Sequence, residues 1–344
     1  MQRILTITAL VLAGVLLAAS AVMLILPIKD TRPFEAGHDP GSVSMLLLGD
    51  YGTADYRQRR VAAMMEAECR RLGGDLFVQT VGDNFYPDGV TSVDDPLWDD
   101  MFESMYDTPC LSQINFYAAL GNHDHGGNID AQMQYGNDSL GSGRWNMPNA
   151  YYLHGHGRGT DNKVLVKVVV LDTTAPIDGQ LAFLRSAFEG KPDAVWRVVI
   201  GHHNIRTRSE KYHEDHRLLN ALLPTLKALN VDLYAAGHSH NLQLLEFPGE
   251  PIYTVTGGGG AHTRSLLAPS PAEDRFISRA LGFATVTFTP TGLSITFTST
   301  SASFFSTLGV AEDTFVADRD CLQAPGGKAC LRMILKKPRS NEPN

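Results

Sequence analysis

Residues 116–124 read FYAALGNHD, in which a short apolar run ends in glycine and is followed at once by asparagine, histidine and aspartate. Four further apolar runs end in the same way, with the pairs Gly49-Asp50, Gly82-Asp83, Gly201-His202 and Gly237-His238. Glycine lets the backbone turn sharply without a steric penalty, which suits the end of a strand. Because ligands bind beyond the carboxyl ends of the strands in open α/β sheets, these ends predict one shared site.

The rest of the chain alternates β-branched apolar runs with amphipathic stretches, which is typical of a layered α/β fold. The predicted strands are 43–48, 76–81, 116–120, 164–171, 195–200, 231–236 and 252–256. The predicted helices are 56–72, 96–105, 180–188 and 216–229. Residues 284–289 and 293–298 alternate strictly around a Pro-Thr-Gly turn, which predicts a β-hairpin. We therefore expect one domain over residues 43–308 and a polar surface tail over residues 309–344.

The first 28 residues differ in composition from the rest, because no charged residue occurs between Ile4 and Ile28. This stretch exceeds the roughly 7–15 residues of a signal-peptide core and reaches the roughly 20 residues that a bilayer span needs. The small residues 18–21 still offer a cleavage site, so an uncleaved anchor, a cleaved signal and a buried helix all stay open. Residues 29–42 read as a linker. An anchor or a signal would make the protein extracytoplasmic, either membrane-anchored or secreted.

The 344 residues carry a formal net charge of −8 and are 43% hydrophobic, which indicates an ordinary globular chain. A non-specific nucleic-acid binder would be basic, so we expect no nucleic-acid binding. An acidic protein also needs a local feature, such as bound cations, to hold an anionic substrate. The four cysteines permit disulfides in an exported chain, although their pairing cannot be read from the sequence.

The residue types at the five strand ends are those that bind first-row transition metals. Asp83 can bridge two cations because a carboxylate has two oxygens. Tyr86 follows three residues later, and its phenol, with an unperturbed pKa of about 10, binds as phenolate only beside a strong Lewis acid. The pattern therefore predicts a metal centre with Fe(III) in one half.

From about Met45 to about Arg264 the sequence resembles the metallophosphoesterases, and within them the purple acid phosphatases, closest to the tartrate-resistant type. The motifs that carry the resemblance are GNHDHGGN (121–128), RWNMP (144–148), LDT (171–173) and GHSHNLQ (237–243). The resemblance implies a four-layer α-β-β-α sandwich and the hydrolysis of phosphate monoesters in acid by a metal-bound hydroxide. Related Ser/Thr protein phosphatases carry a histidine two residues after the first aspartate, where this chain has Gly52.

The resemblance also implies roles for individual residues. The residues that it implies as Fe(III) ligands are Asp50, Tyr86 and His240, with Asp83 as the bridge. Those that it implies as ligands of a divalent ion (Fe, Zn or Mn) are Asn122, His202 and His238. His123 is implied as the group that contacts phosphate and assists the leaving group, and His213 or His216 would face the substrate as well.

The loop after the fourth strand end leaves two functions open. Arg206, Arg208 and Lys211 either attract an anionic substrate or lie on a solvated loop, and His203 is expected to support the site indirectly or to face solvent. We expect a small phosphomonoester or a phosphoprotein as substrate, and a monomeric protein. A phosphodiesterase or nucleotidase specificity, and a catalytically inactive phosphate-binding relative, are the alternatives.

Overall fold

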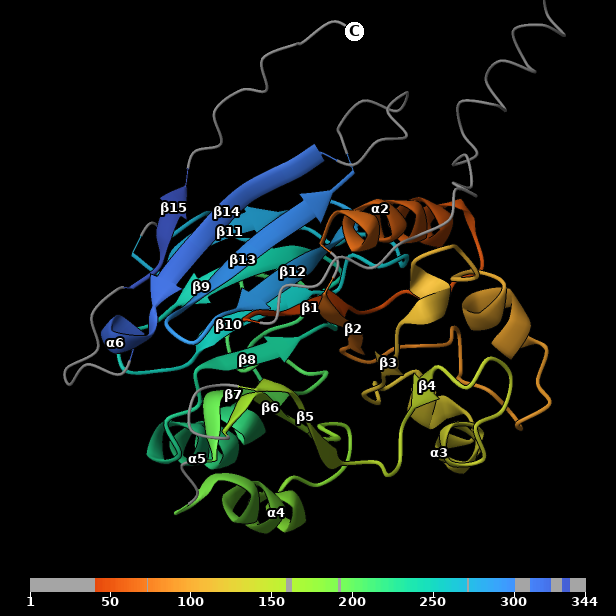
Figure 1. Ribbon diagram of the computed structural model, residues 1–344, viewed down its shortest axis with the longest axis horizontal. Helices are drawn as coiled ribbons and strands as arrows, with labels where there is room; N and C mark the ends of the chain where they lie inside the picture. Colours follow the sequence, from red (N-terminus) through yellow and green to blue (C-terminus); the bar gives the residue numbers. More distant parts are fainter. Residues whose placement is uncertain are drawn as a thin grey trace, which may run out of the picture.

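The computed structural model describes residues 41–72, 74–158, 163–190, 193–270, 272–300, 310–322 and 330–334, and two sheets form its centre (Figure 1). The first sheet contains, in spatial order, β15 (Arg332–Ile334), β14 (Val310–Asp318), β13 (Gly292–Ser299), β12 (Gly282–Phe288), β1 (Val43–Leu48), β2 (Asp75–Thr80), β3 (Phe116–Tyr117) and β4 (Trp145–Asn146). The second contains β11 (Asp274–Ser278), β9 (Leu242–Glu246), β10 (Ile252–Thr256), β8 (Leu233–Ala236), β7 (Ala194–Ile200), β6 (Val164–Val170) and β5 (Tyr152–Arg158).

The helices are α2 (Tyr56–Leu72), α3 (Ile129–Asn137), α4 (Asp178–Phe188), α5 (Leu223–Ala228) and the short α6 (Arg319–Leu322). Single turns of 3-10 helix form η2 (Leu111–Gln113) and η3 (Asp124–Gly126), and single turns of π-helix form η1 (Asp99–Glu103) and η5 (Leu218–Leu222). The predicted helix over 216–229 is thus divided into η5 and α5. Pro224 stands in the first turn of α5, where the missing N–H of proline removes no intrahelical bond.

Alternate residues of strand β6 show how the layers stack. Val166, Val168 and Val170 belong to the core between the two sheets, whereas Val169 packs into a second cluster with α4 and α5. Successive side chains of a strand point to opposite faces, so a strand buried on both sides must be apolar throughout. On the other side of the molecule, α2 packs Val61 and Met65 into the core of the first sheet. The order helix, sheet, sheet, helix confirms the predicted four-layer sandwich.

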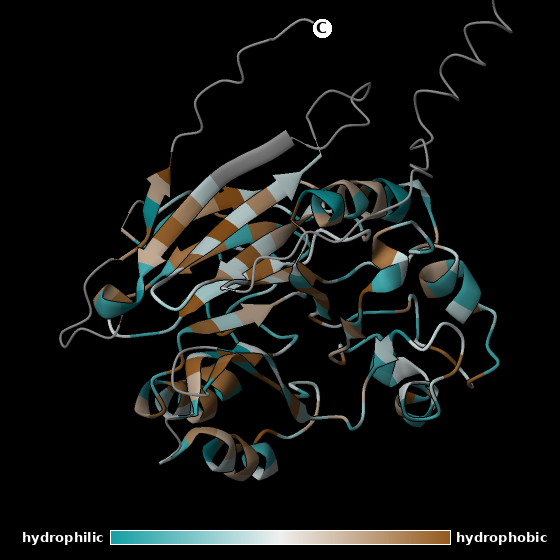
Figure 2. Cartoon of the chain, viewed as in Figure 1, coloured by the Kyte–Doolittle hydropathy of each residue, from teal (hydrophilic) through white to brown (hydrophobic). Residues whose placement is uncertain are grey.

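The hydropathy colouring follows this stacking, because hydrophobic residues colour much of the strands brown and polar residues lie in the surrounding loops (Figure 2). Strands β1 to β4 run parallel in the first sheet, and β6, β7, β8 and β10 run parallel in the second. The predicted hairpin forms β12 and β13, which pair antiparallel from Gly282 and Ser299 to Phe288 and Leu293. Parallel strands end at the same edge of their sheet, so the loops after β1, β2 and β3 emerge together, as do those after β7 and β8.

The predicted polar tail over residues 309–344 is wrong for its described residues. Strand β14 pairs with β13, and β15 pairs with β14, so the first sheet extends well past residue 308. Phe315 and Ala317 are buried, while Thr314 and Val316 are only partly so. The sequence did not predict this alternation of buried and partly buried residues, because acidic residues flank it on both sides and lower the average hydrophobicity of the segment.

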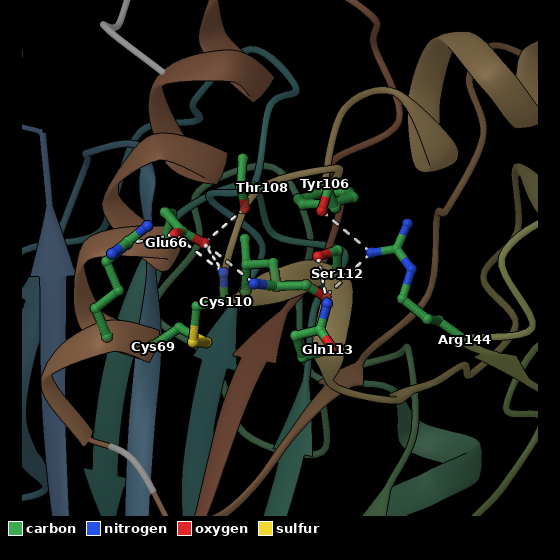
Figure 3. The surroundings of a disulfide bond; sticks show 10 residues. Glu66, Cys69, Tyr106, Thr108, Cys110, Ser112, Gln113 and Arg144 are labelled. Carbon is green, nitrogen blue, oxygen red and sulfur yellow. Dashed lines mark hydrogen bonds and ion pairs between the residues drawn. A yellow bond between two sulfur atoms is a disulfide. The ribbon is translucent and has the colours of Figure 1, made fainter. Parts of the chain in front are cut away.

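Two disulfides join the four cysteines, Cys69 with Cys110 and Cys321 with Cys330. The first ties α2 to the loop before η2, and buried Glu66 strengthens the same junction (Figure 3). Its carboxylate accepts hydrogen bonds from the Thr108 hydroxyl at 2.6 Å and from the backbone N–H groups of Cys110 and Leu111 at 3.1 Å. These bonds satisfy a turn that would otherwise bury unpaired N–H groups.

No helix among the described residues has the length and apolar character needed to cross a membrane. The predicted signal or anchor at 1–28, and residues 29–40 of the predicted linker, lie outside the described part of the chain.

Candidate metal centre

The five strand ends meet at the seam between the two sheets. The loops after β1, β2 and β3 bring Asp50, Asp83 and Asn122 from the first sheet, and those after β7 and β8 bring His202 and His238 from the second. The backbone N–H of His238 donates to Asp50 Oδ2 at 2.9 Å, and the N–H of Asp50 donates to the Gly82 carbonyl at 3.0 Å. Residues far apart in sequence therefore face each other because both sheets end at this seam.

Four residues of the site hold an uncommon backbone conformation. The φ angles are 56° at Asp50, 55° at Asp83, 64° at His238 and 49° at His240. The left-handed region disfavours residues with a Cβ, at roughly 1–3 kcal/mol each, and such strain clusters at functional sites. The surrounding sheet and its loop hydrogen bonds hold these side chains where relaxed backbones would not direct them.

One half of the site gathers four oxygen and nitrogen donors. The Tyr86 hydroxyl lies 2.9 Å from Asp83 Oδ2, 3.4 Å from Asp50 Oδ1 and 3.3 Å from His240 Nε2. The donor atoms of Asp50, Asp83 and His240 all lie within 4.8 Å of one another. His240 Nδ1 lies 3.0 Å from the carbonyl of His262 and donates to it, which leaves the Nε2 lone pair directed at this group.

The other half gathers around His202. Its Nε2 lies 3.2 Å from Asn122 Oδ1, 3.2 Å from His238 Nδ1 and 3.4 Å from Asp83 Oδ1. Its Nδ1 donates to the Val81 carbonyl at 2.9 Å, so again the Nε2 lone pair points inward. The two oxygens of Asp83 thus face different halves, Oδ2 toward Tyr86 and Oδ1 toward His202, which is the geometry of a bridging carboxylate.

The electrostatics of the site fit bound cations. Asp50 and Asp83 are almost fully buried, and within the described residues neither forms an ion pair with lysine or arginine. Burial and the carboxylates of Asp50 and Asp83 raise the pKa of Tyr86, and burial next to His202 lowers the pKa of His238 to about 2. Against the effect of burial, the carboxylate of Asp83 raises the pKa of His202 to about 9, so without a metal ion this imidazole is the counter-charge of Asp83. Buried carboxylates and imidazoles that converge without lysine or arginine are suited to metal ions. The residues present therefore fit a pair of metal ions.

Two glycines allow the loops to approach this closely. A Cβ on Gly52 would lie 1.8 Å from the carbonyl oxygen of Asn84, and one on Gly121 would lie 2.3 Å from Asp83 Oδ1. Both neighbours are fixed by the loop that carries Asp83 and Tyr86. The position two residues after Asp50 consequently has no room for a side chain, let alone a histidine.

The three predicted catalytic histidines differ in their relation to this site. The backbone N–H of His123 donates to Asp83 Oδ1 at 2.9 Å, its Nδ1 contacts the Pro87 carbonyl, and its ring lies 4.4 Å from that of Tyr86. His213 is exposed and lines a cavity of about 210 Å³ that also reaches the ligand candidate His238. His216 is exposed and does not line this cavity, so the structure brings His123 and His213 to the site but not His216.

The sequence did not indicate the roles of two residues near the site, Asp124 and Tyr212. Asp124, buried behind the site, accepts hydrogen bonds from the N–H groups of Gly121 at 2.8 Å and Asn84 at 3.1 Å, and burial with nearby Asp83 raises its pKa to about 6. Tyr212 lies over the second half of the site, with its ring 4.2 Å from that of His238. Asp124 belongs to the motif GNHDHGGN (121–128), so the sequence offered a signal for it. No local pattern indicates Tyr212, because its contact with His238 arises from the folding of a loop.

The two arginines of that loop are engaged elsewhere. Arg206 pairs with Glu250 at 2.7 Å and Glu214 at 3.2 Å, and Arg208 pairs with Asp274 at 2.8 Å and Glu273 at 3.1 Å. They anchor the loop, whereas Lys211 lines the cavity.

Comparisons with known proteins agree with this geometry. A family model described as calcineurin-like phosphoesterase matches residues 44–242. Purple acid phosphatase 3 of Arabidopsis thaliana is 32% identical over 293 residues, and the match covers 77% of this chain and 77% of that protein. Tartrate-resistant acid phosphatase type 5 of Homo sapiens is 30% identical over 259 residues, with coverage of 68% of this chain and 76% of that protein.

Solved structures share the fold. A purple acid phosphatase from yellow lupin seeds superposes with a TM-score of 0.61 at 16% identity, covering 83% of this chain and 54% of that chain. The anchor in the inner membrane complex of Plasmodium superposes with a TM-score of 0.67 at 24% identity, covering 75% and 85% respectively. At these identities the likeness concerns the arrangement of the sheets alone.

Proposed function

Since this chain belongs to the calcineurin-like phosphoesterase family and is an acid phosphatase of the purple acid phosphatase kind, we propose that its two-metal centre pairs Fe(III) with a divalent ion. The observation that carries the proposal is the position of Tyr86, whose hydroxyl reaches three other donors of one half-site within 3.4 Å. A phenol binds there as phenolate only beside a strong Lewis acid, because burial among carboxylates otherwise keeps it protonated.

In this proposal each half of the site holds one ion. Asp50, Tyr86 and His240 would hold Fe(III), and Asn122, His202 and His238 would hold Fe, Zn or Mn in the divalent state. Asp83 would be shared, which its two inward oxygens support. The Nε2 atoms of His202 and His240 are directed inward because Nδ1 of each ring donates a hydrogen bond to a carbonyl oxygen, which supports their role as ligands.

Bound ions would supply a hydroxide nucleophile at acidic pH and neutralise the charge that develops on the phosphate oxygens. The chain's own residues would then handle the leaving group. His123 is fixed by the hydrogen bond from its backbone N–H to Asp83 and by its Nδ1 contact with the Pro87 carbonyl, so the Nε2–H of its imidazolium form can give a proton to the departing oxygen. A positioned acid of this kind contributes about 10²–10⁴-fold. His213, which lines the cavity, is the second candidate, and His216 is the weaker one.

We also propose that the protein works outside the cytoplasm as a monomer, secreted or held by its N-terminal segment. The two disulfides support an oxidising compartment, because such bonds seldom persist in a reducing cytosol.

Two alternatives are less well supported. A neutral-pH phosphodiesterase or nucleotidase would be favoured by a histidine at position 52, where the packing of Gly52 against Asn84 leaves no room. A non-catalytic, phosphate-binding role would be favoured by a lost ligand. Every ligand position of this chain holds a residue type that binds metal.

The test is a visible absorption spectrum of the purified protein together with its metal content. We expect a purple or pink band that Tyr86→Phe abolishes and that Tyr56→Phe, at an exposed tyrosine of α2, leaves unchanged. A colourless wild-type protein with two divalent ions and full activity would show that Tyr86 does not bind Fe(III), and a diesterase or nucleotidase would become the better hypothesis.

A further inference from the structure

We propose that the cavity beside the metal centre is a subsite for a second anionic group, carried by the leaving group of the substrate. The residues assigned to it are Lys211, His203 and Tyr212. This inference rests on the proposed function and deepens it, because it names the class of phosphoester that the site prefers.

The cavity adjoins the place where the reaction would occur. It has a volume of about 210 Å³, and His238, a proposed metal ligand, forms part of its wall together with Lys211, Tyr212 and His203. In this inference a phosphate bound at the two ions directs its leaving group along this wall, where His213, the second candidate proton donor, also lies. The volume suits a small group such as a carboxylate or a phosphate with a few carbon atoms.

Lys211 supplies the positive charge. Its neighbours Arg206 and Arg208 each pair with two carboxylates and so offer little net attraction. Among the described residues, the contact that Lys211 makes is with an aromatic face, since its Nζ lies 4.7 Å from the centre of the Tyr212 ring, and it forms no ion pair there. An exposed ammonium at the wall of a cavity is available to an incoming anion.

His203 supplies a directed hydrogen-bond donor. The hydroxyl oxygen of Thr173 accepts from the backbone N–H of His202 at 3.0 Å and from that of His203 at 2.9 Å, so its own hydrogen remains for the Nδ1 of His203 at 3.1 Å. A neutral imidazole that accepts at Nδ1 carries its hydrogen on Nε2. The Tyr234 hydroxyl also donates to the His203 carbonyl at 2.8 Å, which fixes the backbone.

The remaining charges near the cavity do not oppose an anion. Asp215 also lines it, but its carboxylate pairs with Arg217 at 2.7 Å and accepts the N–H of Arg217 at 2.8 Å. Tyr212, packed on His238, forms an aromatic floor that holds the Lys211 side chain near the site. The lining is thus richer in donors than in acceptors, which suits a carboxylate or a phosphate.

The preferred substrate is then a phosphomonoester whose leaving group carries an anionic group within a few bonds of the scissile phosphate. Hydrolysis breaks the bond from phosphorus to the leaving oxygen and forms one from phosphorus to the oxygen of water. The products are inorganic phosphate and the protonated leaving group. The second anion is a carboxylate or another phosphate, and the subsite chemistry is the same for both.

A matched pair of substrates tests the inference. Glycerol 2-phosphate and 2-phosphoglycerate share a skeleton and differ in one CH2OH or carboxylate group. Pyrophosphate, a phosphoanhydride whose leaving group is itself a phosphate, serves as the probe for a second phosphate. We expect Lys211→Gln to lower the kcat/KM ratio of 2-phosphoglycerate to glycerol 2-phosphate about tenfold, as for loss of a charge-assisted hydrogen bond. Lys227→Gln, which changes the same charge on an exposed residue of α5, should leave the ratio unchanged.

Further variants separate the possible outcomes. His203→Leu should lower the same ratio, and His203→Gln, which keeps a side-chain N–H, should restore part of it. A fall for 2-phosphoglycerate alone would identify a carboxylate as the second anion, and a fall for pyrophosphate alone would identify a phosphate. If Lys211→Gln still hydrolyses glycerol 2-phosphate and changes neither the ratio for 2-phosphoglycerate nor that for pyrophosphate, the inference is overturned. Absence of hydrolysis of all three substrates by the wild-type protein would instead contradict the proposed function.

Discussion

Replacing Gly52 with alanine is expected to disable the metal centre, although the change adds one methyl group. The new Cβ would lie 1.8 Å from the Asn84 carbonyl oxygen and 2.8 Å from the Phe85 Cα, both of them backbone atoms. Ordinary contact begins near 3.4 Å, so the loops that carry Asp50 and Tyr86 must separate by about 1.6 Å. The hydrogen bond from the Tyr86 backbone N–H to the Gly52 carbonyl oxygen, with an N···O distance of 2.8 Å, would break.

A misplacement of about 1 Å typically costs an enzyme about 100-fold in rate, so we expect kcat/KM on glycerol 2-phosphate to fall at least about 100-fold. Overpacking should also lower the free energy of unfolding by about 1–3 kcal/mol. Activity, metal content and urea denaturation would be measured side by side. Gly179→Ala is the matched control, because a Cβ there meets nothing within 4 Å. A Gly52→Ala protein with both metals and wild-type activity would refute the steric argument.

Three other perturbations test separate parts of the structure. Asp124→Asn should lower the free energy of unfolding by about 2–4 kcal/mol in urea, since a buried acceptor of N–H bonds becomes partly a donor, whereas Asp130→Asn on the exposed face of α3 should not. Phe315→Ala should lower the free energy of unfolding by about 3 kcal/mol because its ring is buried, against about 1 kcal/mol for Thr314→Ala, which loses a hydrogen bond with the Thr296 hydroxyl; equal unfolding curves would return this segment to a surface tail. The hydrogen bond to Asp172 raises the pKa of His125, so this pair stabilises the fold fully below the unfolded pKa of about 6.5 and loses its effect as pH rises through the folded pKa. His125→Gln should therefore lower the melting temperature more at pH 5 than at pH 9, and a pH-independent difference would exclude the ion pair as the cause.

Much of the fold could be predicted because its central strands are short, apolar and followed by glycine. Strand β1 and helix α2 have the predicted bounds, and β10 does as well. Strands β5 and β14 were not predicted, because other residue types dilute the hydrophobic pattern of each. Glycine and histidine dilute the pattern of β5, and acidic residues dilute that of β14, while both strands gain their stability from pairing with distant neighbours. Such pairing is a tertiary effect that local propensity does not record.

The site could be predicted at the level of residue type. A strand end followed by Asp, Asn or His is visible in the sequence, and so is the spacing of Asp83 and Tyr86. The choice of nitrogen on His202 and His240 was not predictable, because it depends on the carbonyl groups of Val81 and His262, which approach from other strands and loops. The sequence also could not separate the roles of the three basic residues of one loop. Arg206 and Arg208 form ion pairs with carboxylates that are mostly distant in sequence, whereas Lys211 lines the cavity.

The left-handed backbones of Asp50, Asp83, His238 and His240 have an evolutionary consequence. Glycine adopts this conformation without penalty, so a mutation to glycine at any of the four would delete a ligand and relieve strain together. Natural selection for catalysis has to work against selection for thermal robustness at these positions. Once a lineage no longer needs the reaction, drift would favour loss of the ligands while the sandwich remained intact, and the fold would become available as a binding scaffold.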